Sequence, residues 1–572
     1  MSEFHKMQKF FLMVVFLVPN LLLSEPQSPQ RDKIYGGELR LSVTTVPHTF
    51  NNFMARSTSV TDITMNFFEG LTSTDGVTGD VIPTLAESWV VSENGLIWEF
   101  KLREGVKWSD GVDLTADDVV FTFNDIIFND DISPSEGVFT IDGRQIEVSK
   151  IDERTVKFIL PCPFAPFLRV LGTPIYPQHV LEKYVEEGTL SSVWGVDSSY
   201  ESIVGTGPFI LTSYEKDKKI VLNKNPFYWK RDEKGRQLPY LDRIVFKIYS
   251  DEQEEYQAFL NGDIDYISLS AVQAQGIESK KSKLEFSIYN AGPNFGSQFF
   301  VFNLNSASHN PKTKWFQNLK FRQALAYAVN KEKIVNTIFG GYALPQWSPV
   351  SPSAGTFYNA DVPHYDFNLE KARALLSEGG FIDRNQDGVI EDAEGNQIQI
   401  NVITNEDNIN RVRTAHIVSE DWSKLGISVN IESVSFNEVV NSIFNEQQFD
   451  VALLGLTGGI EPHFGSNIWK SEGRMHMWNP SQSEPATEWE KEIDQIFDRA
   501  AQELDLEKRH ELYNRWQHIA AEQIPMIYTV LPSSIFAIRD RFGNLNPTPY
   551  GGAFHNIESI FVLQKTRNKR IF

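Results

Sequence analysis

The strongest pattern of hydrophobic and polar positions in the chain begins at Trp98. Trp98, Phe100 and Leu102 alternate with charged residues up to position 103. A period of two is typical of a strand that buries one face and exposes the other. We therefore predict a strand over residues 98–103, followed by a turn at 109–111, where Asp and Gly favour a tight bend of the backbone.

A helix is predicted directly after this turn. Thr115 can serve as its N-cap, and Asp118 follows three residues later, where a carboxylate completes a capping box and suits the helix dipole. The apolar positions that follow recur at helical spacing: Val119, Phe123, Ile126 and Ile127. The pattern predicts a strand-turn-helix unit, but it names no function.

The second half of the chain predicts a parallel sheet. Strand-like runs at residues 398–402, 427–431 and 449–454 alternate with helical runs at 408–424 and 436–445. Strands and helices that alternate over short links are typical of a parallel sheet covered by helices. Ligands bind such sheets outside the carboxyl ends of the strands, so the loop after the last strand is the first candidate site.

This loop offers several groups that can contact a ligand. In chain order they are the Thr457 hydroxyl, the open backbone of Gly458 and Gly459, the Glu461 carboxylate and the His463 imidazole. A simple turn at the two glycines stays an equal alternative from these residues alone. Trp469 lies farther along in an aromatic stretch and is a candidate wall of the pocket, with a loop packed by its own side chains as the alternative.

An acidic loop at residues 383–394 fits the template of a calcium-binding loop. Its candidate oxygen ligands are Asp383, Asn385, Asp387, the Val389 carbonyl and Glu394. Gly388 permits the sharp bend that the template needs. The loop occurs once and a strand is predicted after it, so an acidic turn without metal stays an alternative. A calcium ion here would be structural, and no other cofactor is predicted.

Length and charge narrow the class of protein. At 572 residues the chain is expected to fold into two or three domains. Its formal net charge of −22 makes nucleic acid and anionic membranes poor partners. A secreted glycan hydrolase would need two opposed carboxylates, and Glu461 is the one that we can place at a cleft. The sequence has no nucleophile elbow, zinc-binding His-Glu pair or phosphate loop.

The first 24 residues are typical of an export signal. Lys6 and Lys9 precede an apolar run at 10–23, and Ser24 is a small residue at a suitable cleavage point. An uncleaved anchor stays an alternative. The single cysteine, Cys162, lies far from this point, so we expect neither an internal disulfide nor a lipid anchor at the cleavage site. These features predict a soluble periplasmic protein.

A series of short motifs runs through the chain in the order found in one protein family. The motifs lie at 85–89, 205–209, 225–229, 238–244, 260–265, 321–329 and 524–528. Each motif is weak alone. Through their shared order the chain resembles the extracellular solute-binding proteins of bacterial ABC importers, family 5, which includes the dipeptide and oligopeptide receptors.

The resemblance implies an α/β, two-lobed periplasmic-binding-protein fold of type II, cluster C, with an extra domain inserted in the first lobe. The implied parts are a signal peptide at 1–24, lobe I at 25–66, 201–297 and 530–572, the extra domain at 67–200, and lobe II at 298–529. It also implies a monomeric receptor, not an enzyme. Such a receptor captures a peptide-like solute by hinge closure and delivers it to an ABC permease in the inner membrane.

The resemblance also assigns the ligand site to the glycine-containing loop and, after the first strand, to Thr45 and His48. Peptide receptors of the family typically carry Gly-Trp and then, after two intervening residues, an Asp whose carboxylate pairs with the ammonium group of the peptide. Here Leu456 stands in place of the tryptophan and Gly459 in place of the aspartate. Because an unpaired buried charge is costly, we predict Glu461 as the compensating acid. Without such an acid the ligand would be a capped peptide or an oligosaccharide.

Overall fold

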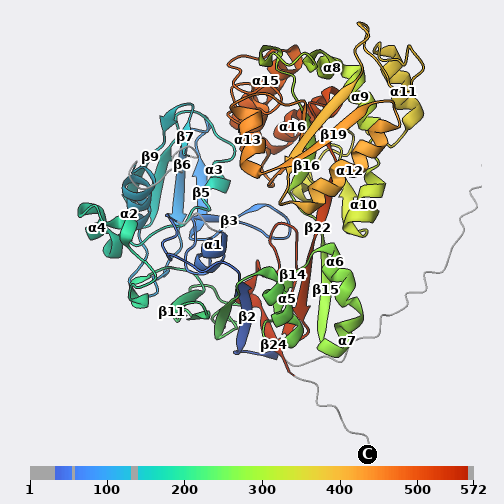
Figure 1. The fold of residues 1–572 in the computed structure, drawn as a ribbon. Coiled ribbons are helices and arrows are strands. Elements are labelled where there is room, and N and C mark those ends of the chain that lie inside the picture. The colour runs from blue at the N-terminus through green and yellow to red at the C-terminus, as the bar shows by residue number, and fades with distance from the viewer. Residues whose placement is uncertain (1–32, 55–57, 130–138, 565–572) are drawn as a thin grey trace, which may run out of the picture.

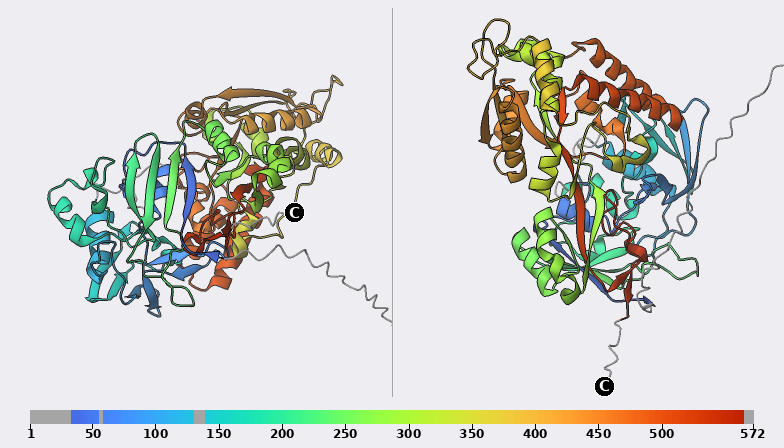
Figure 2. Two further views of the ribbon diagram at one scale, coloured as in Figure 1. Left: turned by 90° about the horizontal axis from the view of Figure 1, so that it is seen from below. Right: turned by 90° about the vertical axis from the view of Figure 1, so that its right-hand side faces the viewer.

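The computed structural model describes residues 33–54, 58–129 and 139–564 (Figure 1). The expected signal peptide at 1–24 lies outside these residues. The described chain forms two large bodies and a smaller one beside them, as the views in Figures 1 and 2 show. Within the described ranges no helix combines the length and the apolar character that a membrane crossing requires.

Four antiparallel strands form the sheet of the smaller body, which we call the side domain. Their order is β5 (Ala86–Val91), β6 (Ile97–Leu102), β10 (Thr155–Ile159) and β9 (Glu147–Asp152). Trp98, Phe100 and Leu102 are buried on one face of β6, which confirms the predicted strand. Phe123 covers this face and meets Phe158 edge-on, with 5.1 Å between the ring centroids.

The helix after this strand, α2 (Ala116–Phe121), begins at the predicted N-cap. The backbone N–H of Thr115 donates to the Asp118 carboxylate at 2.9 Å, and the Thr115 hydroxyl caps the first turn in return, which confirms the capping box. Past α2 the chain widens into a π-helical turn over Thr122–Ile127. This turn still buries the predicted apolar residues, so the side domain keeps a continuous core.

The body that we call lobe I contains a small sheet of β1 (Lys33–Ile34), β24 (Phe561–Leu563) and β23 (Phe542–Gly543) and two larger sheets. The first has the order β11 (Phe209–Glu215), β12 (Lys219–Lys224), β13 (Arg243–Ile248) and β2 (Glu38–Val43). The second has the order β14 (Tyr266–Ser268), β22 (Val530–Arg539) and β15 (Phe286–Pro293). The start of β22 pairs with β17 (Ala343–Pro345), which packs in the core of the other large body. The fully buried Asp265 carboxylate accepts hydrogen bonds from Arg40 at 2.7 Å and from Arg541 at 2.6 Å. It therefore ties together segments from both ends of the chain.

A five-stranded sheet forms the centre of the other large body, which we call lobe II. Its order is β19 (Ser428–Val434), β18 (Gln399–Asn405), β20 (Val451–Leu456), β16 (Ser297–Phe302) and β21 (Met526–Tyr528). β18 runs parallel to both β19 and β20, as predicted. β16 runs antiparallel to its neighbours β20 and β21, so the sheet is mixed and not purely parallel.

Helices cover both faces of this sheet. One core contains Phe300 and Phe302 with α9 (Leu319–Tyr327), α10 (Lys331–Phe339) and α12 (Ile409–Ser423). The opposite core contains Phe299 and Val301 with α13 (Phe436–Phe444), α15 (Glu488–Gln502) and α16 (Leu506–Gln523). Successive residues of β16 thus point into different cores, as the period of a strand requires.

The two lobes are joined by two short segments that lie side by side. One links β15 to β16 and the other links β21 to β22, the long strand that enters lobe I in Figure 2. The backbone N–H of Thr529 donates to the Gln298 carbonyl at 2.9 Å, and that of Asn294 donates to the Pro532 carbonyl at 2.8 Å. Paired crossings of this kind can bend together, which makes them a hinge between otherwise rigid bodies.

Candidate functional site

The predicted ligand loop lines a cavity of about 360 Å³ at the carboxyl end of β20. Thr457, Gly458, Gly459 and Glu461 lie on its wall, and Trp469 closes one side. The remaining wall is largely apolar, and its aromatic residues include Phe295, Phe299, Trp516 and Tyr528. The structure therefore brings these five predicted residues together, in a volume within the range of small-molecule sites.

Glu461 already has a cationic partner within the protein. Its side chain is 3% exposed, and its two carboxylate oxygens accept hydrogen bonds from the Arg509 guanidinium at 2.9 and 2.5 Å. The same carboxylate accepts the backbone N–H of His463 at 3.0 Å. A ligand ammonium group would have to displace a bidentate arginine. The prediction that Glu461 is the free anchor for this group does not fit the geometry.

His463 faces away from this cavity. Its ring meets that of Phe164, from the side domain, with 5.3 Å between the centroids. It lines a separate, open cavity of about 1190 Å³ between the side domain and lobe II. Burial lowers the pKa of His463 to about 4, so the imidazole is neutral at physiological pH. His463 therefore contacts the side domain, on the far side of the loop from Gly459.

The rest of the aromatic stretch near Trp469 is buried core. His476 and Trp478 are fully buried, and both contact the Glu490 carboxylate, His476 at 3.3 Å and Trp478 at 3.0 Å. The Trp469 ring packs against Trp478 and Trp516. Trp469 thus belongs at once to the cavity wall and to the core, whereas His476 and Trp478 support it from behind.

Lobe I contains a second cavity, of about 650 Å³, which the sequence did not suggest. Its wall is built from segments far apart in the chain, among them Ser42, Asp62, Glu69, Tyr228, Tyr266, Phe554 and Glu558. Thr45 and His48, the residues predicted on this side, are exposed on the loop after β2 and are not part of the wall. One hint of this cavity was available in the sequence: Ser42, which lines it, is the last residue but one of β2, the strand that precedes Thr45 and His48.

Residues beside the ligand-loop cavity contact residues beside the lobe I cavity. The hairpin β3–β4 (Thr72–Thr74 and Val81–Pro83) contributes Thr74 to the lobe I cavity, and its tip reaches lobe II. A Cβ atom at Gly79, in this tip, would lie 2.8 Å from Ile460 in the ligand loop. On the other side, Tyr550 meets Phe295 with 5.9 Å between ring centroids. A solute held between the lobes would face both cavities.

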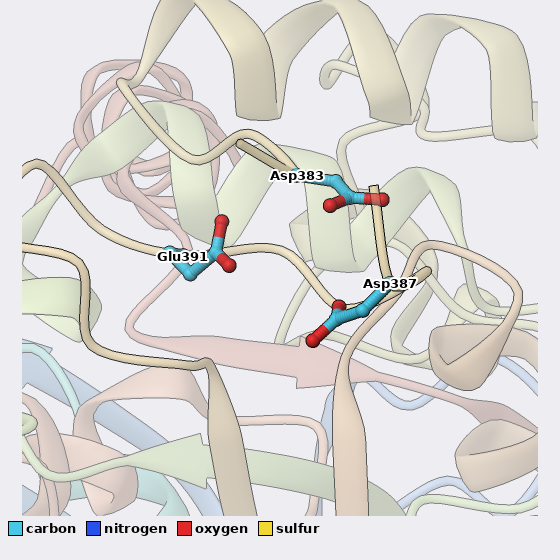
Figure 3. Close-up of side chains that lie close together, drawn as sticks. All are labelled: Asp383, Asp387 and Glu391. Atoms are coloured by element: carbon cyan, nitrogen blue, oxygen red, sulfur yellow. The ribbon is translucent and has the colours of Figure 1, made fainter. Parts of the chain in front are cut away.

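The acidic loop at 383–394 brings carboxylates together, but not the predicted set. Oxygen atoms of Asp383, Asp387 and Glu391 lie within 4.8 Å of one another (Figure 3). Glu394, the predicted last ligand, pairs with Lys314 instead. Ile382 and Glu391 form a β-bridge that turns the loop back early, which explains the exchange. Asn385 donates to the Asp387 carboxylate at 3.1 Å, and the Val389 N–H donates to it at 2.8 Å.

These three carboxylates fit a hard cation such as calcium. Carboxylate oxygens are the ligands that calcium prefers, and Gly388 adopts the positive φ of 90° that the bend requires. Backbone N–H groups already orient Asp383, since Gln386 and Gly388 donate to its two oxygens at 2.7 and 2.9 Å. A metal here would be held by Asp383, Asp387 and Glu391, with no direct connection to either cavity.

Comparisons with known proteins agree with this architecture. The sequence profile of the bacterial extracellular solute-binding proteins, family 5, matches residues 80–476. A probable ABC transporter-binding protein of Deinococcus radiodurans is 30% identical over 81% of this chain and 82% of its own length. The dipeptide-binding protein of Escherichia coli is 28% identical over 85% of this chain and 87% of its own.

The fold also matches that of a solved peptide complex. The oligopeptide-binding protein AppA of Bacillus subtilis, in complex with a nonapeptide, superimposes with a TM-score of 0.67 and 25% identity. The match covers 93% of this chain and all of the AppA chain. Together with the profile match over more than half of the sequence, these likenesses show that the chain belongs to the family 5 bacterial extracellular solute-binding proteins.

Proposed function

We propose that this protein is the receptor of an ABC importer and captures a peptide-like solute between its two lobes. The observation that carries the proposal is a pair of cavities, one in each lobe, whose neighbouring residues meet beside the two segments that join the lobes. Relatives named as dipeptide- and oligopeptide-binding proteins support the solute class. The proposed cycle needs no covalent chemistry by this chain. The closed receptor, a monomer in the periplasm after signal cleavage, would deliver its solute to a membrane permease.

Ligand binding is expected to close the lobes. A solute that contacts both cavities stabilises the closed form, because it binds that form better than the open one. Small-angle scattering of the purified protein should show a smaller maximum dimension at saturation. The ligand for this test is first identified by native mass spectrometry of co-purified material. An unchanged maximum dimension with that ligand at saturation would contradict closure by hinge bending.

A neutral oligosaccharide is the second candidate solute. The observation that favours it is that Glu461, the acid in the described lining of the lobe II cavity, is held by Arg509 and is not free to bind an ammonium group. The aromatic wall of the lobe II cavity suits the faces of sugars as well as apolar side chains. Mass spectrometry separates the two candidates directly, because the co-purified ligand is either a peptide or a glycan.

We also propose a structural calcium ion in the acidic loop. Calcium that binds the native state alone should raise its stability by about 2.7 kcal/mol at a concentration of one hundred times the Kd. Glu391→Gln should abolish the rise in melting temperature, because Glu391 lies with Asp383 and Asp387. Glu394→Gln should keep the rise, because Glu394 faces Lys314. Equal melting temperatures of the parent in calcium and in chelator would exclude the site.

A further inference from the structure

The lobe I cavity contains an acid that the rest of the described chain leaves without a counter-ion. Asp62 lies in α1 (Thr58–Thr64), lines the cavity and is exposed to it. Partial burial raises the pKa of Asp62, and no cation among the described residues opposes this effect. Among the described residues, no side chain donates a hydrogen bond to its carboxylate. The Asp62 charge is therefore available to a ligand.

The other ionisable groups of this cavity have partners within the chain. Lys230 pairs with Glu558 at 3.0 Å. Glu69 accepts hydrogen bonds from the Trp229 indole at 2.8 Å and from the Tyr228 hydroxyl at 3.3 Å. The ring of His555, also on the wall, contacts the backbone carbonyl of Asn546 at 2.9 Å. The unmatched charge of the wall is thus negative, and it belongs to Asp62.

Two further features of the wall suit an organic cation. Tyr266 lines the same cavity as Asp62, and its ring meets that of Phe554 edge-on, with 5.1 Å between the centroids. Aromatic faces attract cations by their quadrupole. Independently, Thr84 lines the cavity at 4% exposure, and its hydroxyl has no hydrogen-bond partner in the described part of the chain. A buried hydroxyl of this kind is costly until a ligand pairs with it.

We propose that the lobe I cavity binds an ammonium or guanidinium group of the solute, with Asp62 as its counter-ion. This inference rests on the proposed receptor function and names the solute class. It places recognition of positive charge in lobe I, whereas lobe II offers Glu461, which Arg509 already occupies. The volume of about 650 Å³ accommodates a lysine or arginine side chain, or the amino terminus of a peptide.

Four tripeptides separate the two sources of an ammonium group. They are Ala-Lys-Ala, Ala-norleucine-Ala and the N-acetylated form of each, and calorimetry measures their Kd values for three proteins. Norleucine lacks the side-chain ammonium group of lysine, and acetylation removes the ammonium group of the amino terminus. For the parent, the change that removes the group bound in the cavity should raise the Kd about 10-fold or more. Asp62→Asn should raise the Kd of the peptides that carry this group by the same factor and leave the Kd of the other peptides unchanged. Asp217→Asn, an equal change of charge at an exposed turn of lobe I, should match the parent.

Each outcome of this experiment decides the proposal. If Asp62→Asn binds the lysine peptide and the norleucine peptide with equal Kd values, the cavity of the parent binds the lysine side chain. If the difference between free and acetylated peptides disappears instead, it binds the amino terminus. Equal Kd values of parent and Asp62→Asn for peptides that do bind would overturn the subsite and leave the receptor standing. Failure of the parent to bind any of the four would overturn peptide reception, and the subsite with it.

Discussion

Glu461→Gln is expected to lower the free energy of unfolding by about 3–5 kcal/mol, because it leaves a buried arginine without its counter-ion. Both partners are almost fully buried, with side-chain exposures of 5% for Arg509 and 3% for Glu461. Arg509 also donates to the Ala500 carbonyl at 2.9 Å, so the pair joins the ligand loop to α15 and α16. Urea unfolding of parent and variant measures the difference.

The chain offers a matched control for this change. Arg515, also on α16, holds Glu492 in the same bidentate manner at 2.7 and 3.0 Å, but this pair is exposed to solvent. Glu492→Gln should therefore cost at most about 1 kcal/mol. The double variant Glu461→Leu with Arg509→Met should recover most of the lost stability, because it removes both buried charges together. If Glu461→Gln and Glu492→Gln lower the free energy of unfolding equally, burial does not increase the cost of breaking the Glu461–Arg509 pair.

The variant Glu461→Gln also tests whether Glu461 binds the ligand. If Glu461 serves Arg509, Glu461→Gln should change the Kd of a free-amine peptide and of its acetylated form by the same factor. If it anchors an ammonium group, the free-amine peptide alone should bind more weakly, by about 10-fold or more. The geometry predicts the first result, since both oxygens of Glu461 face Arg509.

Local patterns in the sequence predicted local structure well. The alternation at Trp98 and the capping box at Thr115 depend on residues within a few positions of one another, and both are confirmed. The order β18, β19 and β20 also followed from adjacent segments with short links. β16 and β21 join that sheet from distant parts of the chain, and no local pattern indicates which strand they will pair with or in which direction.

The candidate site depends on contacts between residues that local patterns in the sequence do not predict. The predicted ligand loop lines a cavity at the end of β20, and this position could be predicted because the end of a strand follows from its pattern; its contact with a ligand stays a prediction. The partner of Glu461 could not be predicted from the sequence. Arg509 lies 48 positions away and reaches Glu461 only because α15 and α16 pack together. In the acidic loop, spacing alone favoured Glu394, whereas the Ile382–Glu391 bridge brings in Glu391.

The second large effect is expected at Glu69, where stability should depend on pH. Burial raises the pKa of this carboxyl to about 7, although Lys230 and the hydrogen bond from Trp229 act to lower it and Glu558 adds to the rise. The ordinary value, 4.5, applies to the unfolded chain. Between these two values the unfolded chain has released the proton while the folded protein keeps it. The contribution of Glu69 to stability is therefore complete below pH 4.5 and is lost as the pH rises to 7.

Glu69→Gln should remove this dependence, because glutamine stays neutral and can still accept from the Trp229 indole. Relative to the variant, the parent should lose about 3 kcal/mol between pH 4.5 and pH 7.5 at about 1.4 kcal/mol per pKa unit. Free energies of unfolding at the two pH values, for parent and variant, give this number. Glu233→Gln, at an exposed turn nearby, is the control and should follow the parent. If parent and Glu69→Gln lose the same stability over this interval, Glu69 ionises normally in the folded protein, and the lobe I cavity carries a second full negative charge beside that of Asp62.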